Sequence, residues 1–249
     1  MCLCKKAEAH TKSVRLVKTS NYGAKQMGTY GIAAVCALCV LAAYLLGNIS
    51  PAIILGRLSG IDIKKEGSGN AGTTNVLRVL GKKAALITLV IDIGKGVVAV
   101  LLGRYVGLWL DSQTGMSFEV AHAETAQAIF LASLLPMLCA LFVLMGHVWP
   151  MIFKFKGGKG VATAFGALVS LCPPIGLFAL LIVAVVVVLT RRVSPGSICG
   201  ALSVPALAHV FMPEFTIVAT VMALIVLVKH RSNIVRILKG EEPKLSFKK

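Results

Sequence analysis

The sequence predicts an all-α membrane protein built as one polytopic bundle of seven transmembrane helices. Its 249 residues are 57% hydrophobic and only 14% charged, with a mean hydropathy of +0.84, whereas a soluble domain has about 25% charged residues. Lys and Arg number 26 against 10 Asp and Glu, and the cations lie mainly between the apolar runs. This placement indicates membrane topology and anionic ligands rather than nucleic acid.

The chain opens with a polar stretch, residues 1–28, that we predict to be a disordered basic tail. It carries six Lys or Arg and the single acid Glu8, and it lacks the apolar core and small residues of a signal peptide. The first apolar run, Tyr30–Leu55, is long enough to span a bilayer, which takes about 20 residues. It is interrupted only by Gly47-Asn48 and Pro51.

Residues 29–249 are expected to form a single transmembrane domain. Its further apolar runs are Ala84–Leu110, Thr125–Met145, Val161–Cys172, Ile175–Thr190, Ser197–Phe211 and Phe215–Val228. Pro173-Pro174 predicts a turn. Val161–Cys172 and Ser197–Phe211 are short, and the number of crossings falls to five if these two runs are re-entrant.

The distribution of positive charge predicts the orientation of the bundle. Four connections carry 18 of the 26 Lys and Arg, namely residues 57–83, 154–159, 191–192 and 229–249. The alternating connections 111–124 and 212–214 carry none. The positive-inside rule therefore puts the N-terminus outside and the C-terminus in the cytoplasm. The basic tail argues for the opposite orientation, and we give greater weight to the four connections.

A glycine-rich segment, Gly67–Arg78, follows the first span. Its glycines fit G-x-G-x-x-G, but this pattern marks a dinucleotide site only between a strand and a helix, so we reject that interpretation between membrane spans. A flexible linker is the plain alternative. The segment nevertheless holds side chains that suit phosphoryl and hydroxyl oxygens, and Arg78 could clamp a phosphate in bidentate fashion. We expect a short interfacial helix from Val76 to Leu80.

A second glycine-rich stretch is Lys156–Gly160, with the sequence KGGKG. It is no nucleotide P-loop, because that motif needs Gly where Phe153 stands and Ser or Thr where Gly160 stands. A plain positive-inside loop is one alternative. However, three glycines expose backbone N–H groups, and a helix is expected to start at Val161, so an anion here would gain those N–H groups and the helix dipole. We therefore predict a phosphate-binding loop.

Several charged or ionisable residues lie at or inside the predicted spans. Asp92 and Lys95 are spaced i, i+3 and are able to pair. Each charge inside the membrane costs about 2.5–3.5 kcal/mol, so their presence indicates a role. They form either a buried structural pair or part of the site. His147 and His230 lie at cytoplasmic ends of spans, as hydrogen-bonding or plain interfacial residues. Neither they nor the seven cysteines show metal-ligand spacing, so no metal or other cofactor is expected.

The basic C-terminal tail predicts an amphipathic helix on the cytoplasmic leaflet, over residues 229–238 and ended by Pro243. Lipid attraction accounts for its cations. It does not require Asn233 or Glu242, so these two residues indicate a further role.

Together these stretches closely resemble the bacterial acyl-phosphate:glycerol-3-phosphate acyltransferase family (PlsY). Three blocks carry the resemblance: GSGNAGTTNVLRVLGKKA at 67–84, GHVWPMIFKFKGGKGVAT at 146–163 and KHRSNIVRILKGEEPKL at 229–245. TRRVSPGSI at 190–198 and DIGKG at 92–96 agree as well. The resemblance covers about residues 30–245. This chain departs from the usual pattern at Ala71, Thr73 and Glu241, which shape turns more than chemistry.

The resemblance implies the site residues position by position. Those expected in catalysis are Ser68, Arg78, Lys159, His230 and Asn233. Those expected to bind substrate are Asn70, Gly72, Asn75, Gly157, Gly158, Gly160, Ser194 and Ser197. Those expected to support the site structurally are Asp92, Lys95, His147 and Glu242.

The resemblance also implies the reaction: a fatty acyl group passes from acyl phosphate, a co-substrate, to the 1-hydroxyl of glycerol 3-phosphate, giving lysophosphatidate and phosphate. This is the first acylation of phospholipid synthesis, at the cytoplasmic face of the bacterial inner membrane. The expected partners are these two substrates and membrane lipids, with a monomer and proximity to the enzyme that forms acyl phosphate as further expectations. The base is His230 or a phosphate oxygen of the donor. A transporter for a phosphorylated solute is the alternative function, although no internal repeat supports it.

Overall fold

The computed structural model describes residues 27–114 and 123–245, and within these ranges the chain forms helices and no strand. The predicted class, an all-α membrane protein, is therefore confirmed. Except for Met27 and Gly28, the predicted N-terminal tail lies outside the described residues.

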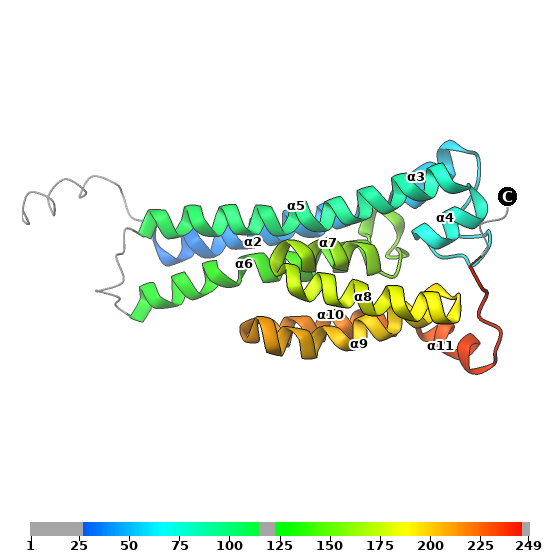
Figure 1. Ribbon diagram of the computed structural model, residues 1–249. Helices are drawn as coiled ribbons and strands as arrows, with labels where there is room; N and C mark the ends of the chain where they lie inside the picture. Colours follow the sequence, from blue (N-terminus) through cyan, green and yellow to red (C-terminus); the bar gives the residue numbers. More distant parts are fainter. Residues whose placement is uncertain (1–26, 115–122, 246–249) are drawn as a thin grey trace, which may run out of the picture.

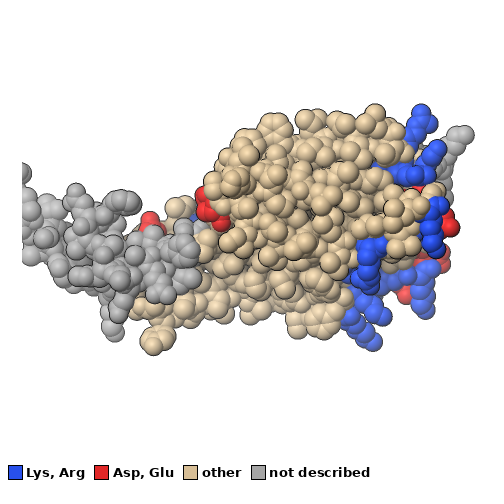
Figure 2. All heavy atoms as spheres, turned by 90° about the horizontal axis from the view of Figure 1, so that it is seen from below, with Lys and Arg blue, Asp and Glu red and all other residues tan. Residues whose placement is uncertain are grey.

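The long helices lie side by side in one elongated bundle (Figure 1). They are α2 (Thr29–Gly47), α5 (Lys82–Thr114), α6 (Ala123–Val148), α8 (Pro173–Thr190), α9 (Val193–Phe211) and α10 (Thr216–Lys229). Shorter elements complete it: α3 (Pro51–Leu58), α4 (Thr73–Val79), α7 (Val161–Leu171), α11 (Arg231–Leu238) and the 3-10 turns η1 (Met151–Phe153) and η2 (Pro213–Phe215). Figure 2 shows Lys and Arg gathered at the end of the molecule where α3, α4 and α11 lie, beside a broad uncharged band.

Five helical segments in the described part are long and apolar enough to cross a membrane. They are Thr29–Leu58, Lys82–Ser112, Leu134–Phe153, Pro173–Thr190 and Val193–Phe211. A sixth results if Pro213–Lys229 and α11, bent by 58°, count as one span. The short α7, with 11 residues, covers only about 16 Å of a hydrocarbon core about 30 Å thick. Seven crossings stay a prediction.

Four predicted boundaries need correction. α9 begins at Val193 rather than Ser197, because its early Pro195 is tolerated in a first turn. At 19 residues α9 is long enough to cross, unlike the predicted short run. Pro173-Pro174 opens α8 instead of forming a turn, which suits a residue without an N–H. α11 starts at Arg231 rather than at residue 229, which belongs to α10; it ends at Leu238, two residues before the left-handed Gly240, so Pro243 is not what ends it. The predicted acidic connection 111–124 is helical at both ends.

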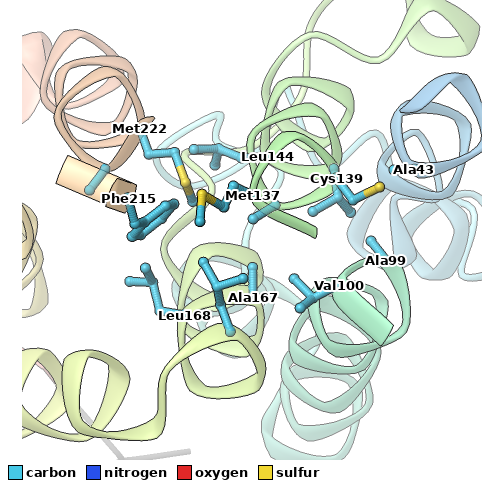
Figure 3. Close-up of a cluster of buried hydrophobic side chains, with 14 of the residues drawn as sticks. Ala43, Ala99, Val100, Met137, Cys139, Leu144, Ala167, Leu168, Phe215 and Met222 are labelled. Carbon is cyan, nitrogen blue, oxygen red and sulfur yellow. The ribbon is translucent and has the colours of Figure 1, made fainter. Parts of the chain in front are cut away.

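The core lies where α6 and α7 meet their neighbours. Figure 3 shows Met137 and Leu144 of α6, Leu168 of α7, Phe215 of η2 and Met222 of α10 directed toward one another. Phe215 and Leu144 are completely buried. Large side chains therefore fill the centre of the bundle, where α10 joins α6 and α7.

Elsewhere the helices meet through glycine. The backbones of α2 and α6 approach so closely at Gly47 and Gly146 that a Cβ on Gly146 would collide with the carbonyl oxygen of Tyr44. A Cβ on Gly166 of α7 would likewise collide with the carbonyl oxygen of Ile93 in α5. Small residues at such crossings are typical of helix packing in membranes, where van der Waals contact supplies much of the association.

We expect Gly146→Ala to destabilise the protein by about 1–3 kcal/mol, because the added methyl group forces α2 away from α6. Gly94→Ala in α5 is the matched control, since a Cβ there meets nothing within 4 Å and Ala favours helix. Thermal unfolding in detergent should show a lower Tm for Gly146→Ala and an unchanged or higher Tm for Gly94→Ala. Equal Tm values for both variants would contradict the close-packing role of Gly146.

Candidate active site

A cavity of about 500 Å³ opens at the basic end of the bundle, among α4, α7, α8, α9, α10 and α11. Its polar lining comes from helix ends and connections, and includes Ser68, Arg78, Lys159, His230 and Asn233. Its apolar lining lies one to three turns further along the helices, and includes Leu168, Ala179, Val183, Ala201, Val204 and Met222. One cavity therefore joins a cationic head to an apolar cleft.

The segment Gly67–Arg78 is folded around Asn75. The Asn75 side chain is 1% exposed, its Oδ1 accepts the Ser68 N–H at 2.8 Å, and its Nδ2 donates to the carbonyls of Ile63 and Glu66 at 3.0 Å. Since each amide atom already has a partner, Asn75 shapes the loop. The sequence-based expectation that Asn75 offers its amide to the substrate is thus not supported by these contacts.

The same loop lines the cavity, and Asn75 itself forms part of that lining. Ser68, Asn70, Gly72 and Arg78 all line it, and α4 starts at Thr73, three residues before the predicted Val76. The buried hydroxyl of Thr73 also lines the cavity and makes no hydrogen bond to the described residues. From the sequence, Thr73 was expected only to shape a turn. Its place at the start of α4, beside the cavity, is the feature that could have marked it as a site residue.

The glycines of the KGGKG stretch serve close packing. The Gly157 N–H donates to the Val148 carbonyl at 3.2 Å and the Gly158 N–H to the His147 carbonyl at 3.1 Å. The prediction that these two N–H groups are free for an anion is therefore wrong. A Cβ on Gly157 would collide with the His147 carbonyl, and one on Gly158 with the His147 ring.

The residues that come after Gly158 in the chain line the cavity instead. Lys159, Gly160, Val161 and Ala162 line it, and Gly160 is the left-handed N-cap of α7 with φ of 85°. No side chain caps α7, so the N–H groups of its first turn are open to an anion. The predicted anion site thus moves from the two paired glycines to the start of α7.

Lys159 supplies the positive charge beside this helix start. Its Nζ donates to Oδ1 of Asn233. Burial lowers the pKa of Lys159 to about 8; Glu242 opposes the shift, whereas Arg236 and Arg78 add to it. An amine with this pKa is mostly protonated at neutral pH and loses its charge in mildly alkaline solution.

A network around Glu242 holds Asn233 in place. Asn233 Nδ2 donates to Ser194 Oγ at 2.7 Å and to Glu242 Oε1 at 2.8 Å. Glu242 also accepts from Ser194 Oγ and from Arg236 Nε, the latter at 2.8 Å. Burial raises the pKa of Glu242, but the hydrogen bonds from Ser194, Asn233 and Arg236 outweigh it, so the net pKa is lowered and the carboxylate is ionised. Glu242 thereby ties α11 to α9.

Arg236 was missed in the sequence, although its i, i+3 spacing from Asn233 puts both on one face of the amphipathic helix. Ser197 lines the cavity, but its hydroxyl donates to the Val193 carbonyl of the preceding turn at 3.1 Å.

His230 is a neutral histidine with one free nitrogen. Its Nδ1 lies 2.8 Å from the Val226 carbonyl, so Nδ1 carries the proton and Nε2 can accept one. Burial is the main reason that the pKa of His230 falls to about 4. The ring therefore lines the cavity uncharged and as a weak base.

Asp92, Lys95 and His147 form a buried cluster behind the glycine loop. Lys95 Nζ lies 2.8 Å from Asp92 Oδ1 and 2.8 Å from His147 Nδ1, and it donates to the carbonyls of Gly47 and Ile49 at 3.2 and 2.7 Å. An ammonium group only donates, so His147 Nδ1 accepts and its ring proton lies on Nε2. The predicted pair is confirmed, and both Asp92 and His147 also line the cavity.

A membrane-embedded cavity with a cationic head and an apolar cleft is typical of an enzyme that handles an acyl chain together with an anionic group. A family model described as glycerol-3-phosphate acyltransferase matches residues 37–240. The chain therefore belongs to the glycerol-3-phosphate acyltransferase family, and it is an integral membrane acyltransferase of phospholipid biosynthesis. The resemblance seen in the sequence is confirmed.

Individual relatives agree. The chain is 41% identical over 214 residues to a glycerol-3-phosphate acyltransferase of Thermoanaerobacter pseudethanolicus, covering 85% of this chain and 96% of that protein. It is 42% identical over 209 residues to one from Neisseria meningitidis serogroup B, covering 83% and 95%. Crystal structures of PlsY (YgiH), an integral membrane glycerol 3-phosphate acyltransferase, match at 31% identity over 85% of this chain and 96% of that one. The TM-score is 0.71 for the glycerol 3-phosphate form and 0.68 for the lysophosphatidic acid form.

Because kcat/KM reports ionisations of the free enzyme, we expect kcat/KM for glycerol 3-phosphate to fall as the pH rises through about 8, where Lys159 loses its proton. Lys159→Arg should remove this fall, because guanidinium stays protonated. Lys159→Met should lower kcat/KM by about tenfold or more, because it removes one charge-assisted hydrogen bond to the substrate. Initial rates between pH 6.5 and 9.5 test this. A flat wild-type profile through this range would show that Lys159 does not titrate there.

We expect Lys95→Met to destabilise the protein by about 3–5 kcal/mol, because it leaves the Asp92 carboxylate buried and unpaired. Asp92→Asn combined with Lys95→Met should recover more than half of this loss. Chemical unfolding of the two variants in detergent measures the difference. If the double variant were no more stable than Lys95→Met, the cluster would not act as a charge pair.

Proposed function

We propose that the protein transfers a fatty acyl group from acyl phosphate to the 1-hydroxyl of sn-glycerol 3-phosphate, giving 1-acyl-sn-glycerol 3-phosphate and inorganic phosphate. The observation that carries the proposal is the single cavity in which a cationic head meets an apolar cleft. Such a cavity holds an acyl chain and two phosphate groups at once. The names of the structural relatives, with glycerol 3-phosphate and lysophosphatidic acid forms, support the acceptor and the product.

The reaction needs positioning more than covalent catalysis. The glycerol hydroxyl oxygen attacks the acyl carbonyl carbon, the bond from that carbon to the phosphate oxygen breaks, and phosphate leaves with the electron pair. Acyl phosphate is a mixed anhydride, so its phosphate departs readily. The protein must mainly hold both substrates in line and neutralise their charge.

Two anionic phosphates repel each other as they meet, and the cavity offers the opposite charge from three directions. Arg78 lies on α4, Lys159 precedes α7, and the first turn of α7 presents N–H groups. Because Arg78 lies on α4 and the other two donors lie at the start of α7, the two groups suit the binding of two phosphates rather than one. No metal or other cofactor is required by this chemistry.

The proton of the attacking hydroxyl is best taken by a phosphate oxygen of the acyl donor. His230 has a free Nε2, but with a pKa of about 4 it is a weak base. The phosphate of the donor gains basicity as its anhydride bond breaks, so the departing phosphate can take up the proton in the same step. His230 then acts as a hydrogen-bonding group in the head. Loss of turnover in His230→Gln with unchanged glycerol 3-phosphate binding would instead assign the base to His230.

The basic end that holds the cavity head faces the cytoplasm in this proposal. Lys and Arg gather at this end (Figure 2), and cytoplasmic connections carry an excess of these residues. Both soluble glycerol 3-phosphate and the phosphate released would then exchange with the cytoplasm of a bacterial cell, whose inner membrane holds the acyl chain. We propose a monomer as the active unit.

The donor is tested with purified protein in detergent micelles. We expect labelled glycerol 3-phosphate to be converted to lysophosphatidate, identified by mass spectrometry, with palmitoyl phosphate and not with palmitoyl-CoA. Release of one phosphate per product completes the stoichiometry. Turnover with palmitoyl-CoA and none with palmitoyl phosphate would overturn the proposed donor while leaving the acyltransferase class intact.

The apolar cleft predicts the acyl-chain preference. Ala201 of α9 lines the cleft, whereas Ala206 on the same helix is exposed on the outside of the bundle. We expect Ala201→Leu to fill the cleft and reduce kcat/KM for palmitoyl phosphate about tenfold more than for decanoyl phosphate, a typical penalty for a blocked apolar pocket. Ala206→Leu should leave the ratio unchanged. An equal loss for both chain lengths in Ala201→Leu would place the chain elsewhere.

A further inference from the structure

The two lysines of the KGGKG stretch serve different cavities. Lys159 lines the reaction cavity, whereas Lys156 lines a second cavity of about 510 Å³. The second cavity lies between α3, the connection that follows it and the segment around η1. The reaction proposed above makes no use of this second cavity, so Lys156 is left without a role.

The second cavity concentrates positive charge that one acid offsets only in part. Its lining holds the four cations Arg57, Lys64, Lys154 and Lys156 against the single acid Asp62. None of the four cations makes an ion pair with a described residue. The pKa of Lys64 is lowered, first by burial and then by Lys156 and Arg57 against the opposing effect of Asp62. An anion would relieve this repulsion.

The chain is held in an unfavourable conformation to present these cations. Lys154 and Phe155 have φ of 54° and 58°, a left-handed conformation that costs about 1–2 kcal/mol for each non-glycine residue. Hydrogen bonds fix it, because the Phe155 N–H donates to the Pro150 carbonyl at 2.9 Å. Strained residues of this kind gather at functional sites. The segment is therefore built to bring Lys154 and Lys156 to one cavity.

Exposed apolar residues alternate with or precede the cations in this segment and form what we call the apolar rim. Met151, Ile152 and Phe155 are 53%, 67% and 61% exposed, and Ile152 lines the cavity itself. Arg57 rests on the Phe153 ring at 5.3 Å. A free phosphate would gain nothing from such a rim, whereas an amphiphile would place its headgroup among the cations and its chains against the rim.

We propose that this second cavity binds the headgroup phosphate of an anionic membrane phospholipid, with the lipid chains lying against Met151, Ile152 and Phe155. The site has no lining residue in common with the reaction cavity, although the connection between α3 and α4 and the connection that carries both lysines contribute to each. The lipid would be held at the cytoplasmic edge of the bundle without being consumed.

The test compares lipid binding to two matched double variants by native mass spectrometry. Lys154→Gln with Lys156→Gln removes two cations of the second cavity. Lys82→Gln with Lys83→Gln, at the exposed start of α5 and outside both cavities, removes the same charge. The probe is dioctanoyl phosphatidylglycerol, with saturating glycerol 3-phosphate present to fill the reaction cavity. Dioctanoyl phosphatidylcholine is the neutral comparison.

We expect the Lys154/Lys156 variant to bind phosphatidylglycerol about tenfold more weakly than wild type, a loss in line with two interfacial cations. The Lys82/Lys83 variant should change by less than about twofold because its cations lie elsewhere. Arg57→Gln, on α3, should also weaken the binding of phosphatidylglycerol. This single variant tests the proposal if the Lys154/Lys156 variant fails to fold. Equal binding by the two double variants, or binding of inorganic phosphate with the same affinity as the lipid, would overturn the proposal.

Discussion

The buried contact of Lys95 with Asp92 and His147 is the interaction on which the rest of the structure depends. Lys95 also binds the carbonyls of Gly47 and Ile49, where α2 ends and α3 has not yet begun. One ammonium group thus joins the broken first span to α5 and α6. Burying such charges is costly unless each is paired and hydrogen-bonded. Lys95 meets that condition through Asp92 at 2.8 Å and through the two carbonyls. Asp92 Oδ1 is paired with Lys95 but makes no well-aligned hydrogen bond to a described residue. The cluster also fixes the His147 ring against which Gly158 packs.

Hydrogen bonds connect this cluster to the reaction cavity. The backbone of Gly157 and Gly158 is bonded to the end of α6, so Lys159 and the uncapped start of α7 are held at a set position. On the opposite wall Glu242 ties α11 to α9 and orients Asn233 toward Lys159. The head of the cavity is therefore rigid before substrate arrives. This suits a reaction in which two like charges must be brought together and held in line.

Much of the fold and part of the site could be predicted from the sequence. Apolar runs and basic connections revealed the membrane bundle, and residue type alone brought out Arg78 and Lys159. The sequence does not show whether a polar group already has a partner inside the protein. For that reason Asn75 and the N–H groups of Gly157 and Gly158 were assigned to substrate. A hydrophobic groove between spans was expected for the acyl chain, but its residues were hidden, because Ala201 looks the same in sequence whether it faces lipid, another helix or a cavity.

The central claim is that one cavity holds the phosphate groups and the acyl chain together. Photo-crosslinking with a palmitoyl phosphate analogue that carries a diazirine near the end of its chain tests this most directly. Peptide mapping should place the label on the cleft residues of α8, α9 and α10, around Ala179, Ala201 and Met222, and unlabelled palmitoyl phosphate should compete for it. Labelling confined to the outer, lipid-facing side of the bundle, with no competition, would contradict the claim.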